Sequence, residues 1–350
     1  MKKVALLAPL PPPYGGIAAW TQRMLQVSLP NDWNVVVVDE KVIGERTVWG
    51  GKSKKSLFQE IKRCFGIWKK LLKVLKDDDL KIVQACIPAG ITSLAREIVS
   101  GIITKIKRRK FIVHFRCTLP YMVSGKMHLF VFKILTLFSD EFFILNQKSA
   151  DFLKATGIKT KFKIIPNFVS NAELSERRTY AEQIKTIVYV GGVIPEKGCD
   201  KIIEVAKQMP NIYFKLIGKI GIEDKNIPQN IFLLGEQNRE IVHKNLLTAD
   251  VFLFLTRFQG EGFSNALAEA MATGLPCIVS DWAANADMVN DPDCITNEEI
   301  ANIIEKIEFF KNSIVRKRVG ERNVFIVKEY FSENVVLKNY VDEYEKLVLH

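Results

Sequence analysis

No stretch of this sequence is apolar for the ~20 residues that a membrane-spanning helix requires. The longest candidate, Leu129–Phe138, is short and is interrupted by Lys133. The first residues, Lys2–Ala8, resemble a signal peptide only superficially, because their apolar part is short and prolines follow at once. We therefore expect Lys2–Ala8 to include a first strand that leads into a loop.

Cysteine pairs with metal-binding or redox spacing are also missing. The six cysteines lie far apart, and none belongs to a CxxC motif. Cys86, Cys117 and Cys277 lie in or beside apolar runs typical of strands, so we expect reduced, buried thiols in a cytosolic protein. The acidic triplet Asp77–Asp79 separates a lysine-rich helical segment from a strand. We interpret it as a solvated turn and assign it no metal.

Charge, in contrast, is plentiful and uneven. Residues 1–171 hold 29 lysines and arginines against 12 aspartates and glutamates, whereas residues 172–350 hold 21 against 27. A basic half joined to an acidic half indicates that one half meets an anionic partner. Anionic lipid and nucleic acid are both candidates, and nucleic acid is the weaker one because no recognition module is visible.

Short apolar runs typical of strands alternate with helical patterns in both halves. We predict strands at 3–8, 34–39, 81–86, 111–115, 141–145, 186–191, 212–217, 231–234, 251–255 and 277–280. Continuous apolar strands between helices indicate parallel sheets covered on both faces, and two such series predict two doubly wound α/β domains.

The polar stretch Ser170–Gln183 separates the two series of strands. The predicted organisation is a Rossmann-like domain at 1–171, a linker at 172–183, a second Rossmann-like domain at 184–331 and a terminal helix at 332–350. We expect this helix to pack back on the body of the protein. The two domains should face a central cleft, where the ligands of such sheets bind.

Two loops carry paired glycines directly after the first strand of each half. Gly15 and Gly16 precede a helical pattern from about Ala18 to Ser28. The segment Gly191–Gly198 precedes a helix at Cys199–Gln208 and contains Lys197, a mobile cation suited to a diphosphate. Glycine allows a ligand to approach the backbone, although a tight strand-to-helix turn explains the first pair equally well. Neither loop is GxGxxG, so a dinucleotide fingerprint is not supported.

The segment Lys52–Lys76 has the pattern of a basic amphipathic helix. Its apolar residues recur at three and four positions, lysines fill most of the others, and Trp68 lies among them. A second basic cluster follows at Lys105–Lys110. This composition is typical of an interfacial membrane helix, but also of a surface helix that covers a sheet. Both interpretations hold together if the helix packs by one edge.

The most informative run begins at Glu261 and ends at Glu269, with seven residues between the two acids. It joins an apolar run to a helix, whose unpaired N–H groups can bind a phosphate. Carboxylates beside a phosphate site suit the hydroxyl groups of a nucleotide sugar. His114 ends another predicted strand, at the edge where such sheets bind ligands.

Taken in order, these segments resemble the retaining glycosyltransferases of family 4, which have the GT-B fold. The segment Glu261–Asp281 resembles the family's E-x7-E helix, glycine-proline turn and following strand. The resemblance extends over nearly the whole chain through six segments: Gly15–Gly16, His114, Ile165–Asn167, Gly191–Gly198, Ala249–Asp250 and Glu261–Asp281.

The resemblance implies a role for each matched residue. Glu261 would bond the donor sugar, Glu269 the ribose, and Lys197 the diphosphate, while His114 would lie beside the reacting sugar. The implied catalytic residues are His114, Glu261 and Lys197, with no metal. The implied donor-binding residues are Gly15, Gly16, Gly191, Gly192, Lys197, Leu234, Gly235, Arg257, Glu261, Gly262, Phe263, Ser264, Asn265 and Glu269. The base of the nucleotide would lie near Leu234–Gln237.

One position departs from the family pattern. Many relatives carry an arginine where Gly192 stands, and its loss removes a bidentate contact to the diphosphate. Arg257 lies in the loop just before Glu261, and we hypothesise that it substitutes for the missing arginine.

The resemblance implies a metal-independent hexosyltransferase that needs no cofactor. It would move a sugar from a UDP- or GDP-linked donor to an acceptor hydroxyl, with retention. We expect a lipid-linked or membrane-surface glycan as acceptor, in the biosynthesis of lipopolysaccharide or another surface polysaccharide. We expect a cytoplasmic protein, with a peripheral position at the inner face of the cell membrane left open.

Three rival functions remain open at this point. They are another enzyme on the same fold (a sugar-nucleotide epimerase or a phosphorylase), a non-catalytic partner subunit, and a nicotinamide-dependent dehydrogenase. Glu261, Glu269 and Lys197 argue against the partner subunit, and the missing arginine argues weakly for it. The absence of GxGxxG argues against the dehydrogenase.

Overall fold

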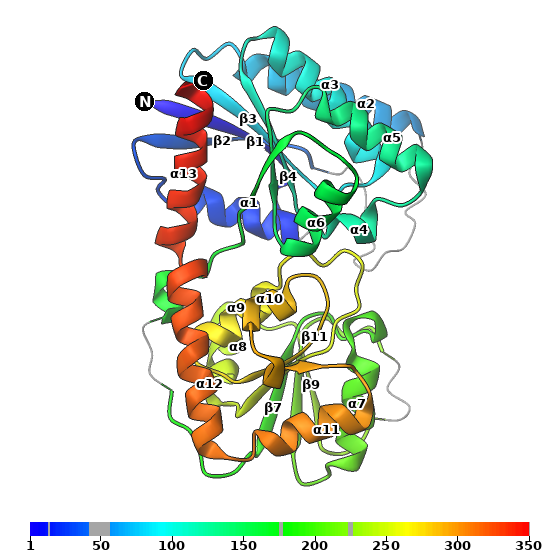
Figure 1. Ribbon diagram of the computed structural model, residues 1–350, viewed down its shortest axis with the longest axis vertical. Coiled ribbons are helices and arrows are strands. Elements are labelled where there is room, and N and C mark those ends of the chain that lie inside the picture. Colours follow the sequence, from blue (N-terminus) through cyan, green and yellow to red (C-terminus); the bar gives the residue numbers. More distant parts are fainter. Residues whose placement is uncertain (13–14, 42–56, 175–177, 223–226, 350) are drawn as a thin grey trace. The chain divides into compact units, whose positions relative to one another are not determined.

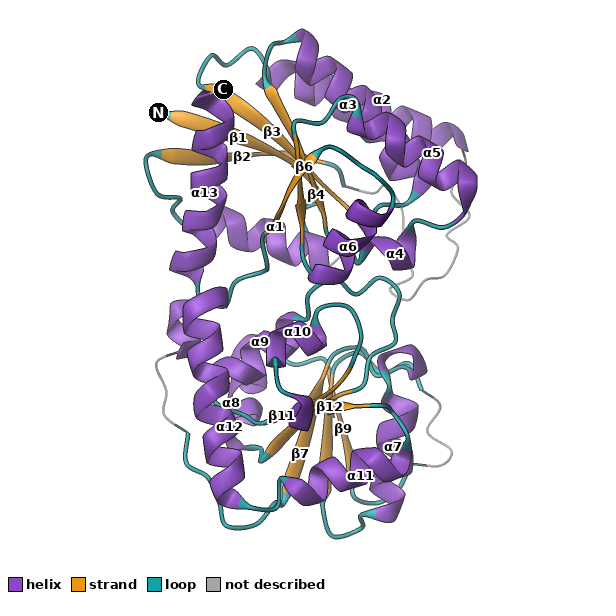
Figure 2. Cartoon of the chain, in the orientation of Figure 1, coloured by secondary structure: helices purple, strands orange, loops and turns teal. Residues whose placement is uncertain are grey.

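The computed structural model describes residues 1–12, 15–41, 57–174, 178–222 and 227–349 (Figure 1). The chain forms two compact units, one made of Met1–Ile165 and Leu337–His350 and the other of Pro166–Val336. Each unit contains a six-stranded parallel sheet with helices on both faces, as Figure 2 shows by its colours. The two doubly wound sheets confirm the predicted fold class.

The first sheet has the strand order β2-β1-β3-β4-β5-β6. Its strands are Lys2–Ala8 (β1), Trp33–Asp39 (β2), Leu80–Ile87 (β3), Lys110–Phe115 (β4), Glu141–Ile144 (β5) and Lys161–Ile164 (β6). The first five were predicted, because β-branched and apolar residues run continuously through them. The edge strand β6 was not predicted: it alternates lysines with apolar residues, and it is only partly covered.

Right-handed crossovers distribute the helices of the first unit over the two faces of its sheet. Gly16–Gln26 (α1) lies on one face, because the chain runs from β1 to β2 in the opposite direction to every later crossover. The other face carries Leu57–Val74 (α2), Ile91–Ile106 (α3), Leu119–Met122 (α4), Gly125–Thr136 (α5) and Gln147–Ala155 (α6). The apolar core beneath these helices includes Leu71, Leu94 and Phe132, all without exposed surface.

The last helix, Glu333–Leu349 (α13), packs on the same face of the first sheet as α1. The Tyr344 hydroxyl donates to Gln84 Oε1 of β3 at 2.7 Å. The indole N–H of Trp33 donates to Glu345 Oε1 at 2.7 Å. The predicted terminal helix is therefore confirmed. Its last 13 residues, Leu337–Leu349, belong to the first unit.

The second sheet has the strand order β12-β11-β10-β7-β8-β9. Its strands are Thr186–Val190 (β7), Tyr213–Ile217 (β8), Ile231–Gly235 (β9), Val251–Phe254 (β10), Cys277–Ser280 (β11) and Ile295–Thr296 (β12). Its α-helices are Cys199–Gln208 (α7), Arg239–Thr248 (α8), Asn265–Ala272 (α9), Asn285–Val289 (α10), Ile300–Phe309 (α11) and Ser313–Ile326 (α12). Short 3-10 turns lie at Asn171–Leu174, Pro195–Lys197 and Pro292–Cys294, and a π-helical turn lies at Val327–Phe331. Only β12, two residues long, escaped prediction among these strands.

The chain passes between the units at Ile165–Pro166 and again at Val336–Leu337. Both crossings lie a few residues from the predicted boundaries at 171 and 332. Part of the predicted linker, 175–177, and the start of the predicted amphipathic segment, 52–56, fall outside the described residues. The six cysteines are free thiols; five of them are buried and Cys64 is half-buried. The predicted burial is confirmed for all but Cys64.

Two helical glycines should respond to alanine in opposite directions. A Cβ at Gly320 of α12 would collide with the carbonyl of Gly274 and the hydroxyl of Tyr180, so Gly320→Ala should destabilise the protein by about 1–3 kcal/mol. A Cβ at Gly66 of α2 would meet no atom within 4 Å, so Gly66→Ala should stabilise it by about 0.5–1 kcal/mol. Thermal denaturation of both variants beside the wild type measures this contrast. A Gly320→Ala protein as stable as the wild type would contradict the close approach of α12 to the turn at Gly274.

Candidate functional site: an ion pair at the switch point of the second sheet

The order of the second sheet reverses between β7 and β10. From β7 the chain builds β8 and β9 on one side, and it then crosses back to add β10, β11 and β12 on the other. The loops that leave β7 and β10 therefore start at neighbouring positions of the carboxyl edge, where ligands of open α/β sheets bind. These loops are 191–198, which contains Lys197, and 255–264, which contains Glu261.

The side chains of Lys197 and Glu261 form an ion pair across this point. Both are largely covered, with 16% and 12% of their side-chain surface exposed. The ammonium group of Lys197 also lies 4.8 Å from the centre of the Phe258 ring, a cation–π contact. The structure thus brings together two of the three predicted catalytic residues, which are far apart in the sequence.

The loop that carries Lys197 packs tightly against the loop after β10. Gly198 has φ +82°, and a Cβ there would collide with the carbonyl of Leu255, so only glycine fits this turn. The backbone N–H of Arg257 donates to the Glu196 carbonyl at 2.8 Å. The guanidinium of Arg257 donates to the Pro195 carbonyl at 3.0 Å. The two loops are therefore joined by main-chain contacts as well as by the ion pair.

Two carboxylates also hold the guanidinium of Arg257. It lies 2.9 Å and 3.0 Å from the two carboxylate oxygens of Asp200 and 3.4 Å from Glu298 Oε2. Partial burial works against its charge, but the hydrogen bonds and charges of Asp200 and Glu298 raise the pKa of Arg257 overall. The hypothesis that Arg257 binds the diphosphate therefore requires it to share or exchange these partners.

The helix α9 begins directly after Glu261–Ser264. Ser264 is its N-cap residue, but its hydroxyl donates to Asn285 Oδ1 at 3.0 Å and makes no cap hydrogen bond, and the first turn contains no acidic residue. The next residue, Asn265, accepts a hydrogen bond from Asn167 Nδ2 at 2.7 Å. The Ser264 side chain therefore does not bond the N–H groups of the first turn. Such N–H groups at a helix start can bind an anion.

Two aromatic rings and a half-buried acid complete this loop and helix. Phe263 is 6% exposed and packs edge-on against Phe331, with 5.2 Å between ring centres. Gly262, just before it, is also buried. Glu269 is half-buried on the second turn of α9. Both acids of the E-x7-E pattern are therefore attached to one rigid loop-and-helix element.

The remaining predicted donor residues of this unit lie at neighbouring strand ends. The Gly191 N–H donates to the Ile217 carbonyl at 2.9 Å, and the Gly218 N–H donates to the Gly235 carbonyl at 2.8 Å. The Gly192 carbonyl accepts a hydrogen bond from the Tyr189 hydroxyl at 2.8 Å. Leu234 and Gly235 are half-buried at the end of β9. These strand ends lie at the same edge as the Lys197–Glu261 pair.

His114, Gly15 and Gly16 belong to the first unit. Gly15 and Gly16 are exposed at the start of α1. His114 has no exposed surface, and its ring lies among Trp20, Phe143 and Tyr340, with ring centres 5.6–5.9 Å apart. In this arrangement the imidazole faces α1 and α13, so its predicted place beside the sugar stays a prediction.

Polar groups also surround the buried imidazole. Its Nε2 lies 3.1 Å from the Arg116 guanidinium, and its Nδ1 lies 3.4 Å from Gln84 Nε2 and 3.3 Å from the Tyr340 hydroxyl. Burial and the charge of Arg116 hold the pKa of His114 well below its usual value of 6.5. His114 is therefore neutral at physiological pH.

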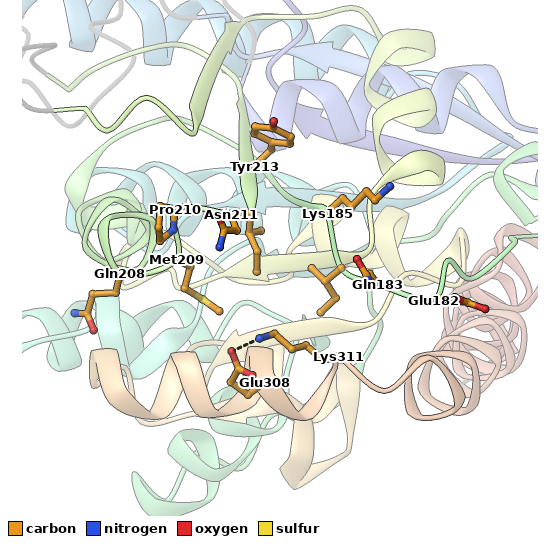
Figure 3. Close-up of a pocket in the computed structure, with 12 residues that line it drawn as sticks. Glu182, Gln183, Lys185, Gln208, Met209, Pro210, Asn211, Tyr213, Glu308 and Lys311 are labelled. Carbon is orange, nitrogen blue, oxygen red and sulfur yellow. Dashed lines mark ion pairs between the residues drawn. The ribbon is translucent and has the colours of Figure 1, made fainter.

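A separate hollow of about 800 Å³ opens at the opposite edge of the second sheet, as Figure 3 shows. Its lining includes Lys185 and Ile212, the residues that directly precede β7 and β8. None of the predicted site residues lines it. Within the described residues, no group of three His, Cys, Asp or Glu side chains is placed to hold a metal ion.

Residues 171–323, which include the Lys197–Glu261 pair and α9, match the model of the family described as glycosyl transferases group 1. The match covers 153 of the 350 residues, all of them in the second unit. A relative, an alpha-galactosylglucosyldiacylglycerol synthase of Streptococcus pneumoniae, is 26% identical over 65% of this chain and 66% of its own length. The chain spans at most about two thirds of the length of the curated relatives it matches.

Solved structures confirm the fold of the whole chain. A sucrose-phosphate synthase of Thermosynechococcus elongatus aligns over 99% of both chains with a TM-score of 0.75 and 13% identity. The Anabaena protein HepE, in complex with UDP-glucose, aligns over 99% of this chain and 100% of its own with a TM-score of 0.68 and 14% identity. Both sheets thus form the GT-B fold, as predicted.

Sequence reasoning missed several residues that shape the site. Asn167 was noted only as part of a motif near the linker, but it fixes Asn265 at the start of α9. Asn285 holds the Ser264 hydroxyl, and Asp200 holds Arg257. None of these partners has a local sequence signal, because each pairs with a residue at least 20 positions away. Gly218 did have one, since a glycine at a strand end indicates close backbone approach.

The neutral state of His114 predicts a measurable dependence of stability on pH. Its folded pKa lies below the unfolded value of about 6.5, so the unfolded chain binds the extra proton and stability falls as pH drops below 6.5. When the unfolded chain binds one proton more than the folded chain, the free energy of unfolding falls by about 2 kcal/mol between pH 6.5 and pH 5. His114→Gln should remove this part of the acid destabilisation. Denaturant unfolding at pH 5 and 7.5 measures the difference. Identical pH dependence in wild type and His114→Gln would show that His114 is protonated in the folded protein.

Proposed function

We propose that this protein transfers a sugar, with retention, from a nucleoside-diphosphate sugar to a hydroxyl of a lipid-linked or membrane-surface glycan. The observation that carries the proposal is the Lys197–Glu261 ion pair, placed at the switch point of the second sheet beside the N-terminus of α9. The family match and the fold support the same reaction class.

The electrostatics of the site suit a diphosphate leaving group. In the structure the charge of Lys197 is balanced by Glu261. A bound donor would offer Lys197 a diphosphate as a second anionic partner, and would offer Glu261 the sugar hydroxyls as donors of hydrogen bonds. The N–H groups at the start of α9 add partial positive charge without any proton transfer. Glu269, one turn further along α9, would accept hydrogen bonds from the ribose hydroxyls.

The chemical step follows from this placement of charge. The acceptor oxygen forms a bond to the anomeric carbon while the bond from that carbon to the diphosphate oxygen breaks. The acceptor proton passes to the departing diphosphate on the same face of the sugar, so the configuration is retained. Lys197 and the α9 N-terminus stabilise the negative charge that develops on the diphosphate.

The donor and acceptor classes rest on the comparisons. HepE was solved with UDP-glucose, which supports a UDP-linked sugar as the first donor to test, with GDP-linked sugars as the alternative. The Streptococcus pneumoniae relative is named for a glycosylated diacylglycerol, which supports an acceptor that carries a lipid. We extend this to lipid-linked glycans of surface polysaccharides, lipopolysaccharide included, and to an enzyme that works at the inner face of the cell membrane.

Replacing Glu269 and replacing Lys197 should change donor binding and turnover in different ways. Glu269→Ala should weaken UDP binding about tenfold, because it removes a charged hydrogen-bond partner of the ribose. Lys197→Ala should lower kcat by about 100-fold with a smaller change in UDP affinity, because it removes charge stabilisation that grows in the transition state. Calorimetric titration with UDP and hydrolysis of UDP-sugars separate the two effects. Lys201→Ala, on the neighbouring helix α7, is the matched control. Wild-type kinetics in both site variants would place the site elsewhere.

Arg257 offers a test that separates direct binding from support of the loop. Arg257→Ala should lower donor affinity about tenfold in either case, since Arg257 braces the Pro195 turn that precedes Lys197. Asp200→Asn distinguishes the two roles. If Arg257 binds the diphosphate, the loss of its competing carboxylate raises donor affinity; if it only supports the loop, donor affinity falls. We expect a rise, in line with the hypothesis that Arg257 substitutes for the arginine missing at Gly192. Titration of both variants with UDP measures the outcome, and a fall with Asp200→Asn would reject the substitution.

A further inference from the structure

Helix α2 carries two separate apolar stripes. Ile67, Leu71 and Leu75, at the helix and just after it, are buried against the first sheet. On the exposed side of the helix, Phe58, Ile61, Phe65 and Leu72 form a second stripe, and the half-buried Trp68 ring packs edge-on against Phe65. Phe58 and Phe65 are 73% and 65% exposed. The helix therefore packs by one edge and presents a complete apolar stripe to its surroundings, which a helix that merely covers a sheet does not need.

The same outward pattern continues on the neighbouring helices. Figure 1 shows α2, α3 and α5 side by side on one face of the first sheet, and α3 contacts both of the others. On α5 and directly after it, Met127, Phe130 and Leu137 are 68%, 59% and 76% exposed, at spacings of three and seven residues. On α3, between them, Ile91 and Ile106 are exposed. We call the outer surface of α2, α3 and α5 the three-helix face.

Charge on the three-helix face is almost entirely positive. Seven exposed lysines lie on the three helices, at 62, 69, 70, 73, 105, 126 and 133, whereas the two arginines, Arg63 and Arg96, are largely covered. The two acids of these helices, Glu60 and Glu97, are each paired with an arginine of the same helix, Arg63 and Arg96. Exposed lysines such as Lys69 on α2 and Lys133 on α5 thus lie beside exposed aromatic rings without competing exposed acids on these helices.

We infer that the three-helix face docks onto the surface of an anionic lipid bilayer. Aromatic and aliphatic side chains would enter the interface between headgroups and acyl chains, while the lysines meet the negative headgroups. No helix among the described residues is long and apolar enough to cross a membrane, so the contact is made by side chains of helices that lie along the surface. This inference rests on the proposed function, which puts the enzyme at a membrane surface, and it names the face of the protein that makes the contact.

Charge complementarity favours a bilayer over a protein partner. A protein interface is depleted of lysine at its centre, because burying each ammonium group is costly without a matched carboxylate. The exposed lysines here occur on all three helices, and a fluid anionic surface can meet each of them without a matched carboxylate. Lysine side chains also reach several ångströms past the apolar stripe, so charge and ring can bind at different depths.

Flotation of the full chain with vesicles tests the inference. The wild type should float with vesicles of phosphatidylcholine and phosphatidylglycerol at low salt, should float less at high salt, and should not float with phosphatidylcholine alone. Phe65→Ser on α2 and Phe130→Ser on α5 should each lower the apparent affinity about tenfold, and the pair Lys69→Gln and Lys73→Gln should lower it to a similar degree. The effect of Phe130→Ser is decisive, because it tests whether α5 acts together with α2.

The matched control is Phe325→Ser, which removes an aromatic ring that is 60% exposed on α12 of the second unit. It should bind vesicles like the wild type. All variants should keep the UDP affinity of the wild type, which shows that they fold and separates this test from the test of sugar transfer. Three results would overturn the inference: no flotation of the wild type with anionic vesicles at low salt, equal effects of Phe325→Ser and Phe130→Ser, or a change in oligomeric state as the main effect of Phe65→Ser.

Discussion

The reversal of strand order in the second sheet is the constraint on which the candidate site depends. Because β10 is added beside β7 after β8 and β9 are complete, two loops far apart in the sequence leave the sheet at neighbouring positions. Lys197 and Glu261 close that gap with an ion pair, and Gly198 and Leu255 bring the main chains into contact beneath it. The topology therefore delivers opposite charges to one place, with nothing in the local sequence to link them.

The largely covered Lys197–Glu261 ion pair contributes little to the stability of the fold. Removing two charges from water costs several kcal/mol, and their attraction roughly offsets that cost. A ligand with a diphosphate and several hydroxyls can bind Lys197 and Glu261 separately. Replacing the ion pair by these contacts therefore costs little free energy. The surrounding contacts hold the backbone while the side chains exchange partners: Asn167 fixes Asn265, Phe331 supports Phe263, and Arg257 ties Pro195 to Asp200. A preorganised backbone is what electrostatic stabilisation of a transition state requires.

Much of the fold could be predicted because the signal is local. Val4–Leu7 and Val251–Phe254 are apolar at every position, so the sequence alone predicts that both faces of these strands are buried. β6 escaped because Lys161 and Lys163 give an edge strand the alternation of a half-solvated segment. His114 was placed correctly at a strand end, yet its surroundings could not be foreseen, because Tyr340 reaches it from a helix 226 residues later. The contact between Arg257 and Asp200 could not be predicted for the same reason, because partners far apart in the sequence produce no periodic pattern.

The helices on the two faces of the first sheet differ in how much apolar surface they leave exposed. Under α1 and α13 the sheet is covered by aromatic rings and by satisfied polar groups, such as the Tyr344–Gln84 hydrogen bond. Over the other face the helices bury one apolar stripe and leave a second one in solvent. Exposed rings such as Phe65 and Phe130 contribute little to the free energy of folding and raise the risk of aggregation. Their place on helices that also carry seven exposed lysines is what the proposed contact with an anionic bilayer requires.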